Sequence, residues 1–218
     1  MRTCEQLIRA LQEGAYDHIF KTLYAPDGNE AAMLRAKDRA VSVVKSFKKR
    51  FSADADVALF SSPGRTEIGG NHTDHQHGCV LAGSVDLDVI AAVSANGTDT
   101  VRIKSAGFDM DVIDINDLSI KSEEYGRASA LIRGVLAAFK NNGYKIGGFD
   151  AYTTSNVLKG SGLSSSAAFE VLVSNIVNGL FNDGSVDAVS IAKYSQFAER
   201  EYFGKPCGLL DQMASSVG

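Results

Sequence analysis

The hydrophobic pattern of this chain changes period near Val57, and that change limits the folds open to it. Before it, residues 3–50 place apolar side chains at mixed three- and four-residue steps between charges, which is typical of amphipathic helices. After it come short β-branched segments separated by glycine, asparagine and Thr-Asp breaks, which are typical of strands. Helical patterns return from residue 126. This order predicts one α+β domain, with helices before and after a mixed, largely antiparallel sheet.

The expected elements follow one another without an internal repeat or a low-complexity linker. Asn96-Gly97 is a plausible hairpin turn between two of the strands. Strands are expected at residues 57–60, 79–85, 85–95, 100–107, 109–116 and 148–156. Helices are expected at residues 126–141, about 164–181 and 187–203, and a further element begins at residues 207–218.

Charge and cysteine content exclude some classes of partner. The formal net charge is −4 and the one basic cluster, residues 48–50, ends a predicted helix, so we expect no nucleic-acid partner. Cys4, Cys79 and Cys207 have no paired spacing, which indicates reduced thiols. The chain shows neither a signal peptide nor an apolar run of the ~18 residues that a membrane span needs. These features predict a soluble, cytoplasmic protein with no membrane partner.

The first of three motifs is LKGSGLSSSAAFEV, residues 158–171, between a predicted strand and an apolar helix. Its glycines let backbone N–H groups point inward, and the helix N-terminus adds further N–H groups and the positive end of a dipole. Serine hydroxyls can donate to phosphate oxygens or ligate Mg²⁺. No Gly-Lys-Ser/Thr follows, so the motif is not a P-loop. It indicates phosphate binding; the alternative is a serine-capped helix after a flexible loop.

The second motif is PGRTEIGGNHTDHQHG, residues 63–78. Arg65 is expected at the end of a strand, followed by a loop rich in amide, imidazole and carboxylate groups. Such side chains suit a ligand dense in hydroxyls, such as a sugar.

The same loop has two other interpretations. Asp74 with His72, His75 and His77 could form a metal site, although the only other histidine is in the N-terminal helices and zinc sites usually draw on more than one segment. The loop could also be a solvated polar turn, which we expect for His75 and His77.

The third motif is AEREYFGKPCGLLDQMAS, residues 198–215. Asp211 lies among apolar and amide side chains, where a carboxylate is either a helix cap or a buried functional base. Glu199, twelve residues earlier on a predicted helix, could face the same cleft.

In this order the three motifs resemble those of the GHMP small-molecule kinases, and among them the galactokinase group. The second motif is similar to that group's signature, Gly-Arg-x-x-x-x-Gly-Glu-His-Thr-Asp; the first resembles the phosphate loop, and CGLLDQMAS resembles the segment with the catalytic aspartate. The resemblance spans residues of about 30–218. It implies that residues 1–218 form the N-terminal, sugar- and phosphate-binding domain, similar to domain 2 of ribosomal protein S5, with a helical region at residues 1–50.

The resemblance also implies an activity, the ATP-dependent phosphorylation of galactose at its C1 hydroxyl with Mg²⁺ as the metal. Asp211 would accept the hydroxyl proton, and Arg65 would hold the aspartate and the developing oxyanion in place. The sugar would be bound by Asn71, His72, Asp74 and Gly208, the phosphates by Gly160, Ser161, Gly162, Leu163, Ser164, Ser165 and Ser166, and Mg²⁺ by Ser166 and Glu199.

Two departures qualify this expectation. Asn71 stands where the signature has glutamate, so a related sugar such as galacturonate is an alternative substrate. The chain also ends before the family's third motif and C-terminal domain. We therefore expect a piece of a longer enzyme that has little activity alone and could self-associate through an exposed docking face. Competing functions are a non-catalytic galactose sensor, a metal-dependent hydrolase, and a kinase for mevalonate or homoserine.

Overall fold

Strand β3 (Leu81–Ala95) explains why helices cover both faces of the sheet. Its residues from Val89 to Val93 are all apolar and buried. Because successive strand side chains point to opposite faces, Val89, Ala91 and Val93 join one apolar cluster, while Ile90 and Ala92 join another. Each face therefore needs its own helical cover.

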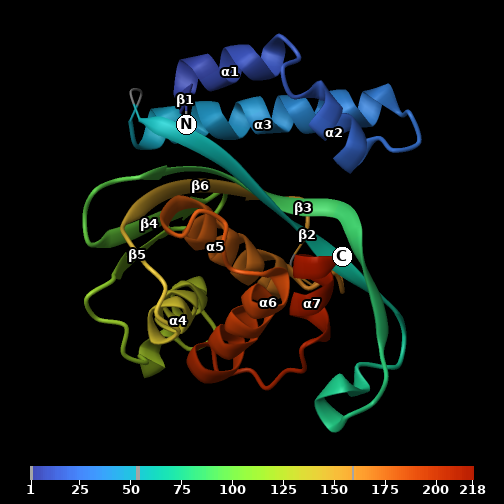
Figure 1. Ribbon diagram of the computed structural model, residues 1–218, viewed down its shortest axis with the longest axis vertical. Helices are drawn as coiled ribbons and strands as arrows, with labels where there is room; N and C mark the ends of the chain where they lie inside the picture. The colour runs from blue at the N-terminus through green and yellow to red at the C-terminus, as the bar shows by residue number, and fades with distance from the viewer. Residues whose placement is uncertain (1, 53–54, 159) are drawn as a thin grey trace.

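The computed structural model describes residues 2–52, 55–158 and 160–218. Helices α1, α2 and α3 lie on one side of the sheet, and α4, α5, α6 and α7 lie on the other (Figure 1). The helices are α1 (Cys4–Gln12), α2 (Asp17–Tyr24), α3 (Glu30–Arg50), α4 (Ala128–Asn141), α5 (Ser165–Phe181), α6 (Ala188–Phe197) and α7 (Leu210–Val217), with short turns η1 (Thr73–Gln76), η2 (Ser122–Glu124) and the π-helical η3 (Ala198–Tyr202).

The sheet has the order β1-β2-β3-β6-β4-β5 within the described ranges. Its pairs are antiparallel except for β4 with β6, which run parallel. The prediction of an α+β domain with a mixed, largely antiparallel sheet is therefore confirmed. The remaining strands are β1 (Arg2–Thr3), β2 (Asp56–Gly69), β4 (Thr100–Ser105), β5 (Met110–Asp114) and β6 (Phe149–Ser155).

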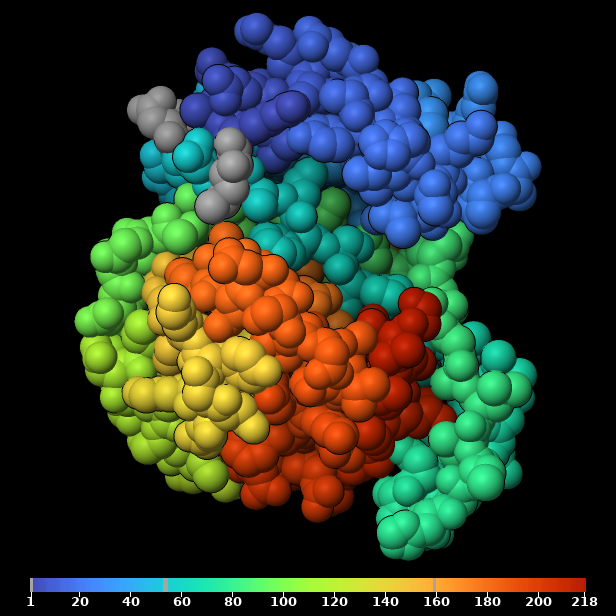
Figure 2. Space-filling model, in the orientation of Figure 1, coloured from blue at the N-terminus to red at the C-terminus, as the bar shows by residue number. Residues whose placement is uncertain are grey.

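Two predicted strand boundaries were wrong. β2 continues past residue 60 to Gly69, so Arg65 lies within a strand instead of at its end. β3 is one strand where two were expected, at residues 79–85 and 85–95. Both strands stay paired to each other beyond the apolar core, through irregularities at Pro63/Arg65 and Glu67/Gly69. This long paired arm projects beside the red C-terminal residues in Figure 2.

The predicted hairpin at Asn96-Gly97 was also wrong, because β6 lies between β3 and β4. Asn96 instead closes the end of the sheet: its Nδ2 donates to the Thr100 carbonyl (2.9 Å) and to Asp150 Oδ1 (3.0 Å). The helix expected at residues 187–203 is present, as α6 up to Phe197 and then as the π-helical η3.

The helices expected at residues 3–50 are present as α1, α2 and α3, and a buried polar contact fixes them to the sheet. The Asp88 carboxylate accepts hydrogen bonds from the Tyr24 hydroxyl (2.6 Å), from Arg39 and from Ser61. Burial and the charge of Asp88 raise the pKa of Tyr24 to about 12. Tyr24 therefore stays protonated and donates to Asp88 at any ordinary pH.

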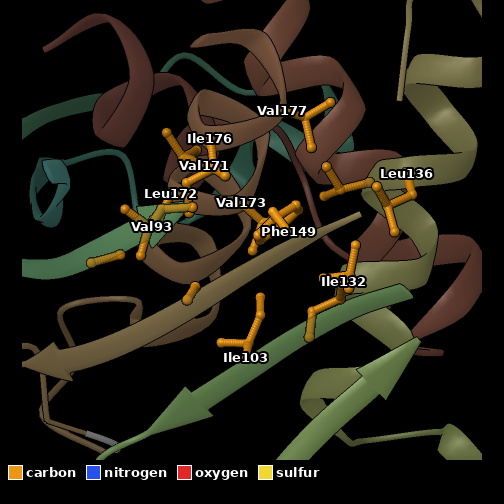
Figure 3. Packing of buried hydrophobic residues seen from close by; sticks show 14 of the residues in the cluster. Val93, Ile103, Ile132, Leu136, Phe149, Val171, Leu172, Val173, Ile176 and Val177 are labelled. Atoms are coloured by element: carbon orange, nitrogen blue, oxygen red, sulfur yellow. The ribbon is translucent and has the colours of Figure 1, made fainter. Parts of the chain in front are cut away.

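The larger apolar cluster lies between the sheet and helices α4, α5 and α6 (Figure 3). It includes Phe149 of β6, Leu136 of α4 and Val173 of α5, all fully buried. In the part of the chain that the structure describes, no helix combines the length and apolar character needed to cross a bilayer.

Candidate active site

Arg65, in the second motif, contacts residues of both the first and the third motif. Its side chain projects from β2 and is almost fully buried. Nε donates to Asp211 Oδ1 (2.6 Å), Nη1 donates to the Gly162 carbonyl (2.5 Å), and Nη2 lies 2.7 Å from His72 Nε2. Residues 146 positions apart in the chain thus form a charge-assisted pair at the meeting point of the three segments.

Asp211 lies in the first turn of α7 with its side chain 17% exposed. Its Oδ1 accepts from Arg65 and its Oδ2 accepts from the Ser164 hydroxyl. The Asp211 oxygens bond to Arg65 and Ser164 and to no N–H group of α7, so Asp211 is not a helix cap, which was one sequence-based interpretation. The carboxylate is held by two donors and directed at the glycine- and serine-rich loop.

In that loop, residues 160–166, glycines let the backbone pack closely against β2 and leave its N–H groups accessible. Gly160 and Gly162 have φ values of +81° and +78°, a region that glycine adopts without strain. Gly64 of β2 lies against it, since a Cβ there would come within 2.9 Å of the Leu163 carbonyl. The N–H groups from Gly162 to Ser166 find no acceptor among the described residues. They are free to bind an anion at the start of α5.

The loop after β2 touches the start of α7 through Asp74. Its Oδ2 accepts a hydrogen bond from the Leu210 N–H at 2.9 Å. Gly208 leaves room for this contact, because a Cβ there would be 1.8 Å from the same oxygen. Asp74 and Gly208, both predicted sugar ligands, are therefore neighbours of Asp211.

The remaining residues of this loop do not converge on one point. Asn71 is exposed in a left-handed conformation (φ +54°), and His75 and His77 are exposed beyond it. His72 turns back toward Arg65. Within the described ranges, no three histidine, cysteine or acidic side chains are grouped so that they could hold a metal.

The second predicted pair, Ser166 and Glu199, lies at the other end of the loop. Glu199 is fully buried on η3, and its Oε1 accepts from the Ser166 hydroxyl (2.9 Å) and from Lys205 Nζ (2.8 Å). Its Oε2 accepts from Gln212 Nε2 at 2.7 Å. A π-helical turn is a frequent device at functional sites, and here it aims the carboxylate at the start of α5.

Comparison with known proteins identifies the family. One model, described as the galactokinase galactose-binding signature, matches residues 45–95, and another, described as the GHMP kinases N terminal domain, matches residues 130–218. The galactokinase of Clostridium tetani is 34% identical over 178 residues, which are 80% of this chain and 45% of that protein. This chain belongs to the GHMP kinase family. It spans about half the length of the curated relatives it matches.

Solved GHMP kinases share the fold. The structure of Lactococcus lactis galactokinase complexed with galactose superimposes with a TM-score of 0.74 at 28% identity, over 81% of this chain and 46% of that one. The Methanococcus jannaschii mevalonate kinase has a TM-score of 0.63 at 17% identity over 74% of this chain and 51% of that one, which supports the fold alone.

Four residues of this GHMP kinase chain were missed by sequence reasoning. Glu67, Lys205 and Gln212 contact predicted residues, and Glu170 accepts a hydrogen bond from Gln212. Glu170 carried a signal, because it is a charged residue in the otherwise apolar helix segment after Ser166. The other three have no local signal, since a single polar residue in a predicted loop or at a helix start usually faces solvent.

Glu170 makes the stability of the chain depend on pH. It is fully buried, and burial first and the charge of Glu199 second raise its pKa well above the ordinary 4.5. A raised pKa means that its stabilising contribution is complete below about pH 4.5 and is lost as the pH rises toward the folded-state pKa. Glu170→Gln stays neutral, so we expect its stability relative to wild type to increase from pH 5 to pH 8, by on the order of 1 kcal/mol.

Urea unfolding of both proteins at pH 5 and pH 8, in the presence of a chelator, measures this difference. The exposed Glu123→Gln is the matched control and should follow wild type at both pH values. Parallel pH dependence of wild type and Glu170→Gln would show that Glu170 is ionised in the folded state.

Proposed function

We propose that this chain is the sugar- and phosphate-binding part of a kinase that transfers the γ-phosphoryl group of ATP to the C1 hydroxyl of galactose. One observation carries the proposal: the Arg65–Asp211 pair lies between the loop after β2 and the loop before α5. A hydroxyl bound beside the first loop would face a phosphate bound at the second, with a carboxylate between them. Membership of the GHMP kinases, with galactokinases among the relatives, supports a sugar acceptor.

Asp211 is the group we assign as proton acceptor. The Arg65 guanidinium fixes its Oδ1, and the Ser164 hydroxyl fixes its Oδ2. The carboxylate is therefore held in one orientation before substrate arrives, and proton transfer needs no reorganisation. Arg65 also places a positive charge where the attacking oxygen gains negative charge.

We assign phosphate binding to residues 160–166. The free N–H groups and the N-terminus of the 17-residue helix α5 stabilise negative charge there. We assign the sugar to Asp74, Gly208, Asn71 and His72. In this arrangement Asp74 keeps its Oδ1 for a sugar hydroxyl while its Oδ2 holds the start of α7.

The donor set at Ser166 and Glu199 fits Mg²⁺, which prefers one or two carboxylates together with substrate phosphates. The ammonium of Lys205 already lies on Glu199 Oε1, so the site accepts a cation. Mg²⁺ would neutralise charge on the phosphates during transfer. Ser166 and Glu199 would hold it on the side of the loop away from Arg65.

Lys205 should compete with that metal. Burial acts to lower the pKa of Lys205, but its hydrogen bond to Glu199 and the charge of Glu199 outweigh burial, so the pKa is raised and the ammonium persists. Lys205→Met removes a positive charge from the oxygen that the metal needs, and we expect Mn²⁺ to bind the nucleotide-free chain about tenfold more tightly. Calorimetry measures this affinity, with the exposed Lys45→Met as control. Unchanged or weaker binding would place the metal elsewhere.

The part of the galactokinase relatives that this chain does not match supplies, in our proposal, the other side of the cleft over ATP. We accordingly assign residues 1–218 to one sugar- and phosphate-binding domain with a helical region at residues 1–50. Alone, the chain should transfer phosphate slowly, because closure over the substrates and exclusion of water contribute much of the rate. A face left uncovered in the chain alone would favour self-association.

The test is phosphate transfer from ATP to galactose, glucose, galacturonate, fucose and N-acetylgalactosamine. Two preparations are compared: the chain alone, and the chain joined to the unmatched part of the Clostridium tetani galactokinase. Calorimetry measures sugar binding to both. Transfer to galactose in the joined protein supports the proposal, and transfer to galacturonate alone would assign the specificity to Asn71. Binding of galactose without transfer to any sugar would replace the kinase with a sensor.

A further inference from the structure

We propose that Glu67 is a positioning residue that fixes the tautomer and orientation of His72, and through His72 the aim of Arg65. Glu67 projects from β2 next to the irregularity at Glu67/Gly69, and bulges of this kind redirect side chains. Its Oε1 accepts from the His72 backbone N–H at 2.8 Å, and its Oε2 lies on His72 Nδ1. One carboxylate thus holds both the backbone and the ring of the same residue.

The proton inventory of this contact leaves one arrangement for a neutral ring. Arginine can only donate, so the Nε2 atom 2.7 Å from Arg65 Nη2 must accept. The ring proton is then on Nδ1, facing the carboxylate of Glu67, which accepts it. The opposite tautomer would set two donors against each other at Nε2 and two acceptors against each other at Nδ1.

Glu67 also supports an unusual backbone. Asn71 and His72 both have positive φ values, +54° and +53°, which non-glycine residues adopt at a cost. The hydrogen bond from the His72 N–H to Glu67 closes this turn against β2. Without it, the ring, which is 47% exposed, has room to leave Arg65.

Arg65 needs the support of His72 because each part of its guanidinium has a separate partner. Nε holds Asp211, Nη1 holds the Gly162 carbonyl, and Nη2 holds His72. Before a sugar binds, both ring nitrogens of His72 have protein partners, Glu67 at Nδ1 and Arg65 at Nε2, and Nε2 also lies 3.6 Å from Asp211 Oδ1. His72 therefore supports both members of the Arg65–Asp211 pair. For the proposed transfer reaction, on which this functional consequence rests, Glu67 keeps the Arg65–Asp211 pair aligned.

Nitrogen NMR of the histidine rings tests the proposal without any substrate. The chain has four histidines, and His72→Gln identifies the signal of His72. At pH 8 we expect wild-type His72 in the Nδ1–H form. Glu67→Met, which keeps the side-chain length and removes both acceptors, should shift His72 toward the Nε2–H form that a free histidine favours. The exposed Glu123→Met should leave His72 unchanged.

Two results would overturn the proposal: a wild-type His72 in the Nε2–H form, or a Glu67→Met protein whose His72 keeps the Nδ1–H form. In the joined protein, Glu67→Met is expected to lower kcat by about 10- to 100-fold with little change in the KM for ATP. Absence of transfer in the wild type would contradict the proposed function, while the NMR result would still decide the role of Glu67.

Discussion

Asp211→Asn is expected to lower kcat for phosphate transfer to the sugar by about 10²- to 10⁴-fold, the usual contribution of a general base. The amide matches the carboxylate in shape, and its oxygen still accepts from Arg65 Nε. The amide nitrogen can donate to the Ser164 hydroxyl oxygen, which then accepts a hydrogen bond where it donated one to the carboxylate. The side chain therefore keeps its place and loses its charge and its capacity to take a proton.

The matched control is Asp183→Asn. Asp183 is exposed after α5 and has a φ of +53°, which asparagine tolerates as well as aspartate. Both variants should unfold at the urea concentration of their parent to within a small shift, while Asp211→Asn alone loses transfer. Near-normal transfer by Asp211→Asn would show that the carboxylate is not the proton acceptor. Catalysis would then come from positioning of the substrates by Arg65 and the phosphate loop.

The layered arrangement of the fold could be predicted because apolar periodicity is a local property. The long helix α3 and the apolar helix α5 appeared at the expected residues for that reason. Strand pairing is not local. The turn at Asn96-Gly97 has the composition of a hairpin, yet β6, more than fifty residues later, takes the place beside β3 because both carry apolar side chains on both faces.

The site shows the same division. Arg65 and Asp211 were expected together only because three motifs in order resembled one family, since nothing local connects them. The bonds that orient them were not predictable in this way. Glu67 lies in the part of β2 that was expected to be a loop. Lys205 lies in a loop, where a lysine usually faces solvent, yet it pairs with the buried Glu199. Their roles depend on side-chain directions that only the folded chain defines.

Phe149→Ala is expected to lower the free energy of unfolding by about 3–5 kcal/mol, the usual cost of truncating a buried phenylalanine. Phe149 is fully buried at the start of β6, in the same cluster as Leu136 and Val173 (Figure 3). Removing its ring leaves a cavity between the sheet and two helices that are held by other contacts and cannot fully close it. Urea unfolding followed by circular dichroism measures the change.

Phe108→Ala makes the same chemical change at a side chain that is 66% exposed, and should cost less than about 0.5 kcal/mol. A Phe149→Ala cost no larger than that of Phe108→Ala would mean that the cluster repacks around the deletion. Because β6 leads into the loop at residues 160–166, Phe149→Ala also tests whether the site depends on core rigidity. Phe149→Ala molecules that remain folded should transfer phosphate normally, since the Arg65–Asp211 pair has no contact with Phe149 among the described residues. Asp211→Asn should instead keep its stability and lose phosphate transfer.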